Sequence, residues 1–292
     1  MKKLLGIGLV SVLLAACAQP APPAAAPPEP PQGEQAAEAP ADLEEAPLSR
    51  LDAILERGVI TMATSPDYAP FTFVDPRLTG VEGIVGADIE FARFVAERLG
   101  VELEIQPMDF TASLAAVQTG SVDFNVGGLT WVEEREQAMM LTSPYNAGTI
   151  QGILVPVDRA AELATAEDFA GLTLAAQNAS LQLNLVTEQL PEATPQVIAA
   201  VPEGILMVLG GHVDGVVLAG IVGEQFANNY PDLVMSDFTF DVEHIGTVAV
   251  MPLGSYELFD AFEEIIAYVV ENDLYSQWMA EASALADELA IN

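Results

Sequence analysis

The sequence predicts an α/β fold of two lobes, each a mostly parallel sheet flanked by helices, joined by a two-strand hinge. Strand-like and helix-like apolar segments alternate from about residue 59 onward, which is typical of parallel sheets. A pattern also recurs at a distance of 91 positions, because Leu114, Val117, Gly120, Val122 and Asp123 are matched by Ile205, Val208, Gly211, Val213 and Asp214. A repeated helix, glycine stop and strand-opening aspartate favours two similar lobes over one large sheet.

The first half of the folded region contains three strands and two helices by its apolar pattern. Apolar runs predict strands over 60–63 and 122–126, and alternation of apolar residues predicts a strand over 101–105. Apolar residues on one helical face predict a helix over 89–99 that ends at Gly100. A shorter helix is predicted over 114–118, with Gly120 at its end.

The second half repeats this rhythm. Strands are predicted over 172–176 and 215–218, and helices over 181–190, 205–209 and 222–229. Residues 205–221 are very apolar, but His212, Asp214 and several glycines interrupt them. We therefore expect a buried helix, turn and strand there instead of a membrane span.

The N-terminus has the features of an export signal. Lys2 and Lys3 precede an apolar run over 4–16, and small residues lead directly to Cys17. A cysteine at this place resembles the lipobox of bacterial lipoproteins, in which its sulfur carries a diacylglycerol. We expect a lipoprotein signal peptide over 1–16 and an extracytoplasmic protein, lipid-anchored to a bacterial membrane at the periplasm or cell surface. The alternative is an ordinary signal peptide with a cysteine there by chance.

A tether is predicted between the cysteine and the folded region. Residues 18–47 hold 9 of the 20 prolines, many alanines and almost no bulky apolar side chain. Such a segment cannot bury enough surface to fold, and proline keeps it extended. We therefore expect 17–47 to be a lipidated cysteine followed by a disordered spacer.

The charge of the chain is strongly negative, at −34. Both lysines lie in the predicted signal, which leaves seven arginines against 43 acidic residues. Nucleic-acid binding is disfavoured because phosphates would be repelled. The acidity indicates either a solvated surface suited to solubility or saline surroundings, or a field that attracts cationic ligands.

The segment 127–135 contains the most informative polar pattern. A predicted strand leads into Gly127 and Gly128, and Thr130 and Glu133 have the spacing of a capping box, so a helix is predicted to begin at Trp131. Amide groups at a helix start favour anions. Arg135 would add a guanidinium that matches a carboxylate. The alternative is a well-capped helix with a surface arginine.

Several motifs in order resemble the solute-binding proteins of polar amino-acid ABC transporters (extracellular solute-binding family 3), which have the periplasmic-binding-protein fold. The likeness runs from about residue 59 to 280. Its motifs are the strand and Tyr-x-Pro-Phe turn over 60–71, Gly86 to Ile89, 114–123, Gly128 to Thr130 followed by Arg135, and the late turn over 271–275.

The resemblance implies that seven residues bind the ligand: Ser65, Tyr68, Phe110, Gly128, Thr130, Arg135 and Ser180. Arg135 would pair with the ligand carboxylate, and the Gly128 and Thr130 amides would complete that pocket. Tyr68 and Phe110 would enclose the ligand side chain, although core packing also explains two aromatic residues. Ser180 would contact the carboxylate from the other lobe, or would only cap the following helix.

One position departs from the family pattern. Where the family has an aspartate that holds the ligand's α-amine, this chain has Ala219, and Asn178 and Ala179 also differ from the usual residues. An unpaired buried ammonium is costly. Either another acid such as Glu224 or Glu243 replaces the aspartate, or the ligand lacks an ordinary α-amine.

The implied function is capture of a small carboxylate-bearing solute, an amino acid or a related compound, by hinged closure, and its delivery to an ABC permease. The first lobe is expected over 48–151 plus 247–292 and the second over 152–246, with crossings near 152–155 and 245–247. We expect a monomer with no cofactor, no metal and no catalytic residue. The alternatives are an enzyme resembling cyclohexadienyl or arogenate dehydratase, although His212 and His244 are the only histidines, and a ligand sensor for a membrane receptor.

Overall fold

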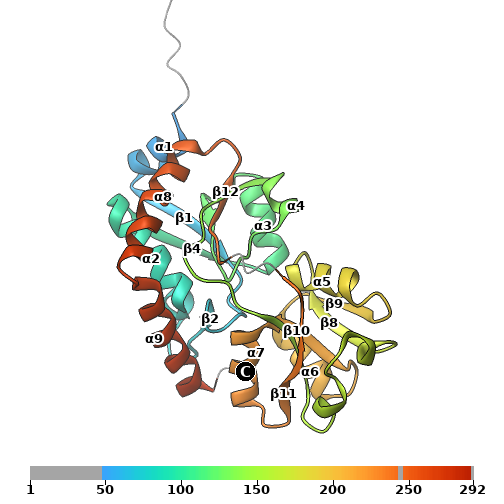
Figure 1. The fold of residues 1–292 in the computed structure, drawn as a ribbon. Coiled ribbons are helices and arrows are strands. Elements are labelled where there is room, and N and C mark those ends of the chain that lie inside the picture. The colour runs from blue at the N-terminus through green and yellow to red at the C-terminus, as the bar shows by residue number, and fades with distance from the viewer. Residues whose placement is uncertain (1–47, 243–245, 291–292) are drawn as a thin grey trace, which may run out of the picture. The chain divides into compact units, whose positions relative to one another are not determined.

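Two five-stranded sheets organise the folded part of the chain in the computed structural model, which describes residues 48–242 and 246–290. Figure 1 shows the two sheets side by side with helices around each. Several predictions fall outside the described residues: the signal over 1–16, the lipid attachment at Cys17, the spacer up to 47, and Glu243.

The first sheet has the strand order β4-β1-β5-β12-β6. Its strands are β1 (Val59–Thr64), β4 (Glu102–Pro107), β5 (Phe124–Asn125), β6 (Met139–Leu141) and β12 (Val250–Pro252). Strand β1 runs parallel to β4 and β5, whereas β12 is antiparallel to its neighbours. Both faces of this sheet are covered by apolar side chains, and we call the sheet and the helices on it the first lobe. Its helices are α1 (Arg50–Arg57), α2 (Ala87–Leu99), α3 (Phe110–Gln118), α4 (Glu133–Glu136), α8 (Tyr256–Glu271) and α9 (Leu274–Leu289).

The second sheet has the order β11-β7-β10-β8-β9 and forms the second lobe. Its strands are β7 (Gln151–Pro156), β8 (Thr173–Gln177), β9 (Thr194–Ile198), β10 (Gly215–Ala219) and β11 (Leu233–Thr239). Its helices are α5 (Leu181–Gln189), α6 (Val201–Leu209) and α7 (Gly220–Asn229), with short 3₁₀ turns at Ala160–Glu162 and Ala166–Phe169. In the first lobe a further 3₁₀ turn, Gly80–Gly83, lies between the two strands of a small sheet, β2 (Phe73–Val74) and β3 (Ile84–Val85).

The predicted two-lobed α/β fold is confirmed, and most predicted elements are found within one to four residues of their limits. Buried, evenly spaced apolar residues specify them, as in α2, whose buried face includes Ile89, Phe91 and Val95. The apolar stretch over 205–221 forms α6, a turn and β10, as expected. In the described part of the chain, no helix has both the length and the apolarity needed to cross a membrane.

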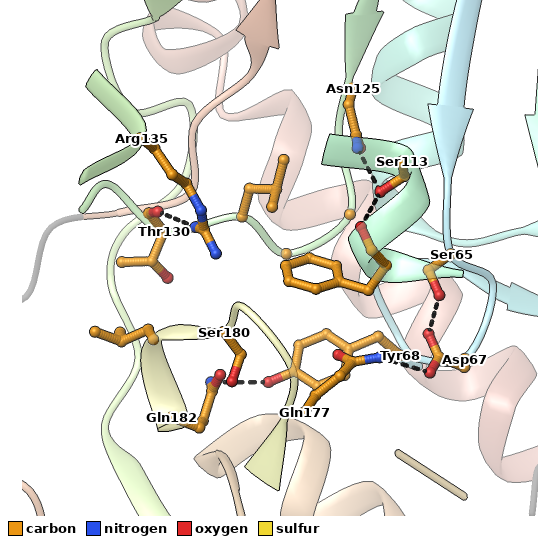
Figure 2. Close-up of a pocket in the computed structure, with 15 residues that line it drawn as sticks. Ser65, Asp67, Tyr68, Ser113, Asn125, Thr130, Arg135, Gln177, Ser180 and Gln182 are labelled. Atoms are coloured by element: carbon orange, nitrogen blue, oxygen red, sulfur yellow. Dashed lines mark hydrogen bonds between the residues drawn. The ribbon is translucent and has the colours of Figure 1, made fainter. Parts of the chain in front are cut away.

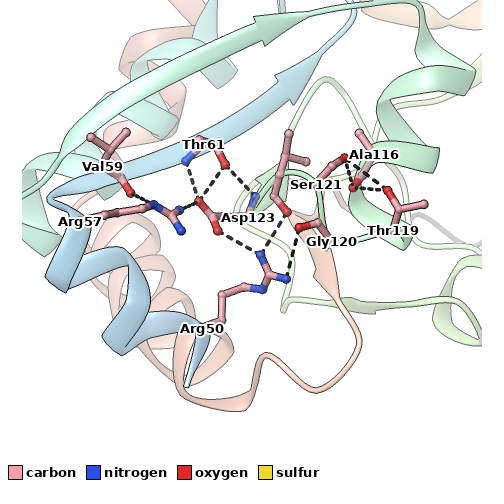
Figure 3. A network of polar contacts seen from close by, with 10 residues as sticks. Arg50, Arg57, Val59, Thr61, Ala116, Thr119, Gly120, Ser121 and Asp123 are labelled. Atoms are coloured by element: carbon pink, nitrogen blue, oxygen red, sulfur yellow. Dashed lines mark hydrogen bonds and ion pairs between the residues drawn. The ribbon is translucent and has the colours of Figure 1, made fainter. Parts of the chain in front are cut away.

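The repeated pattern corresponds to the same set of aspartate contacts in each lobe. In the first lobe, Asp123 accepts a hydrogen bond from the Thr61 backbone N–H at 2.7 Å, and its own N–H donates to the Thr61 carbonyl at 3.0 Å. Figure 3 shows the Arg50 and Arg57 side chains converging on the same carboxylate. Asp123 thereby fastens the start of β5 to the beginning of the first lobe.

Asp214 makes the corresponding contacts in the second lobe. It accepts from the Thr173 N–H at 2.8 Å, returns its own N–H to the Thr173 carbonyl at 2.8 Å, and pairs with Arg159 at 2.7 Å. The preceding glycines of the two copies, Gly120 and Gly211, both have positive φ, at 71° and 69°. The sequence repeat is therefore a repeat of contacts as well as of elements.

Two chain segments connect the lobes, and Figure 1 shows the first of them, between β6 and β7, passing from one sheet to the other. The sequence predicts the first crossing near 152–155, but these residues lie within β7, which pairs with β10 and β11. That prediction is wrong because an apolar strand of the second sheet begins at Gln151, so the crossing lies between Leu141 and Gln151. The two crossings pair with each other, since the Tyr145 N–H donates to the Thr247 carbonyl at 3.0 Å.

Candidate functional site

A cavity between the two sheets brings together the residues expected to bind a ligand. It spans about 480 Å³ of space, part of which is open to solvent, and Figure 2 shows its polar side chains directed inward from both lobes. All seven predicted ligand-binding residues line it. The lining residues are Ser65, Asp67, Tyr68, Phe110, Ser113, Asn125, Gly127, Gly128, Leu129, Thr130, Arg135, Gln177, Ser180, Leu181 and Gln182.

Arg135 is the principal cationic group of this cavity and is only 7% exposed. Its Nη1 donates to the Thr130 carbonyl at 2.7 Å, and its Nη2 donates to the Ala179 carbonyl of the second lobe at 3.2 Å. Its Nε is buried without a hydrogen-bond partner among the described residues. Burial lowers the pKa of the guanidinium to about 10, so it stays charged at neutral pH. A buried cation with an unused donor is the natural partner of an anion.

The loop before Arg135 differs from the prediction. Thr130 caps no helix, because α4 begins only at Glu133, has Val132 as its N-cap and shows no side-chain cap. The predicted capping box and the helix start at Trp131 are wrong, since Thr130 instead forms an antiparallel bridge with Thr247 of the returning crossing. A helix of one turn has a small dipole. Positive charge at this loop therefore comes from the Arg135 side chain.

Gly128 lines the cavity, but its amide is already occupied. Its N–H donates to Asp88 Oδ2 at 2.6 Å, so it is not free to complete a carboxylate pocket. Gly128 has φ 65°, and a Cβ at this position would lie 2.9 Å from the Tyr68 ring. Only glycine therefore fits here, because it tolerates this φ and leaves room for the ring.

Asp88 lies beneath this loop and is fully buried. Its Oδ1 accepts from the hydroxyls of Tyr145 at 2.8 Å and Tyr275 at 2.6 Å. Burial raises the pKa of Asp88 to about 6, despite three hydrogen bonds that favour the charged form. Because Tyr145 lies in the first crossing and Tyr275 in α9, this carboxylate joins the cavity loop to both.

The two predicted aromatic residues both line the cavity, with different surroundings. Tyr68 stacks on Phe71 with ring centroids 5.8 Å apart, and its hydroxyl accepts from the Ala219 N–H at 3.1 Å and from Gln182 Nε2 at 3.3 Å. The Phe110 ring lies 5.6 Å from Arg135 Cζ, within the range of a cation–π contact. Tyr68 therefore links the two lobes, whereas Phe110 supports the guanidinium.

The two predicted serines come from opposite lobes. Ser180 is the N-cap of α5, and its Oγ accepts from the Leu183 N–H at 3.2 Å. The alternative that it caps the helix is therefore confirmed, although its hydroxyl proton is not used by that bond. Ser65 donates from its Oγ to Asp67 Oδ1 at 2.7 Å.

Asp67 lies directly before Tyr68 in the 60–71 motif and was given no role by the sequence. Among the described residues it is the only acidic one that lines the cavity. Besides Ser65, it accepts from Gln177 Nε2 at 3.1 Å and from the Val201 N–H at 3.0 Å, both in the second lobe. Burial raises the pKa of this carboxyl. An acidic residue beside the turn that carries Tyr68 was the available signal, whereas nothing in the sequence pointed to Gln182.

The surroundings of Ala219 form a second cavity next to the first, with about 390 Å³ of empty volume. Every described residue that lines it is uncharged: Phe71, Gly128, Thr130, Gly148, Thr149, Gln151, Leu181, Gln182, Ala219, Val242, Gly246 and Thr247. Glu224 is exposed on α7 and lines neither cavity, so the suggestion that it replaces the missing aspartate is wrong.

The described residues contain no cluster of three or more histidine, cysteine, aspartate or glutamate side chains placed to hold a metal. His212 lies exposed at the turn after α6, away from the cavity lining. The titratable side chains at the cavity are therefore those of Arg135, Asp67 and Tyr68.

Known proteins resemble this chain in sequence and in fold. The family model described as bacterial extracellular solute-binding proteins, family 3, matches residues 60–281. The arginine-binding extracellular protein ArtP of Bacillus subtilis is 25% identical over 218 residues, which cover 73% of this chain and 81% of that protein. Cyclohexadienyl dehydratase of Pseudomonas aeruginosa is 33% identical over 97 residues, only 33% of this chain and 35% of the enzyme.

Among solved structures, an amino-acid ABC transporter substrate-binding protein of Streptococcus pneumoniae bound to L-arginine has a TM-score of 0.76 and 27% identity. The match covers 81% of this chain and 98% of that chain. The fold is thus the two-lobed periplasmic-binding architecture. Since the family model spans most of the chain, the protein belongs to family 3 of the bacterial extracellular solute-binding proteins.

Proposed function

We propose that this protein captures a small carboxylate-bearing solute, an amino acid or a close relative, outside the cytoplasm and delivers it to an ABC permease. The observation that carries the proposal is Arg135, a buried guanidinium with an unpaired Nε at an inter-lobe cavity. The relatives support the solute class, because ArtP is named for arginine and the streptococcal protein is bound to L-arginine.

The proposed mechanism is closure of the lobes 48–151 plus 247–292 and 152–246 about the two crossings. Hydrogen bonds of 3.0 to 3.3 Å already join the lobes around the cavity. Arg135 donates to the Ala179 carbonyl, Gln177 and the Val201 N–H donate to Asp67, and Gln182 and the Ala219 N–H donate to Tyr68. Opening would expose these groups to water. A ligand that pairs with Arg135 would favour the closed form, and a permease would recognise that form.

Removal of Arg135 tests the proposal. Arg135→Ala is expected to weaken binding of the physiological solute by roughly 30-fold to several thousand-fold, because losing one partner of a buried charged pair costs about 2–5 kcal/mol. Calorimetry would measure the affinity, and thermal unfolding would check the fold. Arg93→Ala, which removes an arginine with a half-exposed side chain, is the matched control. Equal affinity of the Arg135 variant and the wild type would exclude this site.

We further propose that the protein is a monomer held on the membrane by lipid at Cys17. The supporting observations are the lipobox-like sequence and the extracellular character of the family. Fractionation of cells that express Cys17→Ser checks the anchor, since the variant should leave the membrane fraction. A variant that stays in the membrane fraction would argue against lipidation.

A dehydratase activity is the second candidate, because cyclohexadienyl dehydratase of Pseudomonas aeruginosa is 33% identical to this chain over 97 residues. Catalysis needs a proton donor or acceptor in the cavity, and Asp67 is the one acidic residue among those that line it. We propose binding over catalysis. Incubation with a prephenate-like acid, followed by chromatography, distinguishes them, because accumulation of a decarboxylated product would favour the enzyme.

A further inference from the structure

We propose that the ligand of this cavity is a carboxylate with a cationic group at its far end, in which Arg135 holds the carboxylate and Asp67 holds the cation. An α-amine next to the carboxylate would then contribute little to affinity. This inference rests on the proposed function and specifies the chemistry of the same site.

The first argument is that the cavity holds two opposite charges and neither is paired. Arg135 contacts only backbone carbonyls, and Asp67 accepts only from a hydroxyl, a side-chain amide and a backbone N–H. No ion pair of the described residues includes either side chain. An uncompensated charge that is shielded from water is costly, and Arg135 is buried while Asp67 is half-buried. A ligand with both charges would compensate both side chains at once.

The second argument is the placement of the two charges. Figure 2 shows Arg135 and Asp67 at opposite sides of the cavity, with Tyr68 on the Asp67 side. An α-amine and its carboxylate are separated by a single carbon, so together they cannot reach both side chains. Ser65 donates to Asp67 Oδ1, and a carboxylate oxygen can accept a second hydrogen bond, such as one from a ligand N–H.

The third argument concerns the place where the family's α-amine partner would lie. Ala219 has no acidic side chain, and every described residue around the adjoining cavity is uncharged. The Ala219 N–H is already bonded to Tyr68. Among the described residues, an ammonium at that place would find no counter-ion, whereas a cation at Asp67 would have one. Burial also raises the pKa of Asp67, and a bound cation would reverse this shift.

Calorimetry with four probes tests the inference on the wild type. L-Arginine has the carboxylate, the α-amine and a terminal cation; 5-guanidinopentanoate lacks only the α-amine; L-citrulline replaces the cation by a neutral group; pentanoate has the carboxylate alone. We expect L-arginine and 5-guanidinopentanoate to bind within about tenfold of each other. L-Citrulline should bind at least about 30-fold more weakly, and pentanoate more weakly still.

Variants locate the cation subsite. Asp67→Asn keeps the size of the side chain and should weaken 5-guanidinopentanoate by at least about 30-fold, while changing pentanoate little. Glu97→Gln, which removes an exposed carboxylate on α2, is the matched control and should leave all four affinities unchanged. Glu243→Gln tests the alternative acid that the sequence offers, and by this inference it too should leave the affinities unchanged. Because Asp67 also contacts the second lobe, circular dichroism and the pentanoate affinity verify that the variant folds and closes.

The outcomes separate this inference from the proposed function. Loss of binding in Arg135→Ala but not in Asp67→Asn would overturn the cation subsite and keep the carboxylate site. A loss confined to Glu243→Gln, a strict need for the α-amine, or failure of both guanidinium probes to bind would also overturn it. Binding of the probes with no effect of either Arg135→Ala or Asp67→Asn would reject the cavity as a whole.

Discussion

The Asp88 carboxyl is expected to make a pH-dependent contribution to the free energy of unfolding. Comparison of the wild type with Asp88→Asn measures this contribution. The wild-type carboxyl is fully buried, and its pKa is raised from 3.8 to about 6 because burial disfavours its charged form. The groups that face it are the Tyr145 and Tyr275 hydroxyls and the Gly128 N–H. Burial and the Asp88 charge raise the pKa of both tyrosines, so they stay protonated over the range concerned.

The sign follows from the raised pKa. The folded protein holds the Asp88 proton more tightly than the unfolded chain, so the contribution is complete below pH 3.8 and is lost as pH rises through about 6. The shift of about two units corresponds to about 3 kcal/mol. The free energy of unfolding of the wild type, relative to the variant, should therefore fall by about 2–3 kcal/mol between pH 4 and pH 7.

Urea denaturation at half-unit steps from pH 4 to pH 7, followed by the fluorescence of Trp131 and Trp278, measures this difference. Titration of the other acidic residues affects both proteins and is removed by subtraction. Glu97→Gln, on the exposed face of the same helix, controls for the loss of one negative charge. Parallel curves for the wild type and Asp88→Asn over the whole range would refute the reasoning, whatever their separation at pH 7.

Two further predictions concern the cavity. Tyr68→Phe removes the acceptor of the Ala219 N–H, so closure should cost about 1–3 kcal/mol more and ligand affinity should fall by about 5- to 100-fold; calorimetry measures this, and an unchanged affinity would contradict the inter-lobe role of the hydroxyl. Gly128→Ala places a Cβ at positive φ and 2.9 Å from the Tyr68 ring, so we expect it to destabilise the fold by at least about 1–2 kcal/mol in urea denaturation and to weaken ligand binding. A stable Gly128→Ala variant with normal affinity would show that the loop relaxes easily.

The sequence located the lobes and their repeat because these depend on local periodicity. The spacing of apolar residues around 89–99 sufficed to predict α2, and the helix, glycine and aspartate pattern sufficed to relate 114–123 to 205–214. Arg135, which an ordered set of motifs pointed to, lines the cavity, while its role toward a ligand stays a prediction. The capping box at Thr130 failed because a contact with Thr247, 117 positions away, replaced the local one.

By itself, the sequence determined the fold class and the repeated element and drew attention to Arg135, because each could be recognised from short local patterns and their order along the chain. The tertiary structure alone decided that Asp67 lies across the cavity from Arg135, that Asp88 occupies the Gly128 amide, and that Tyr68 bonds to Ala219. Such contacts join residues 40 to 151 positions apart. Burial, and hence the balance of charge inside the site, depends on what the rest of the fold places around each group.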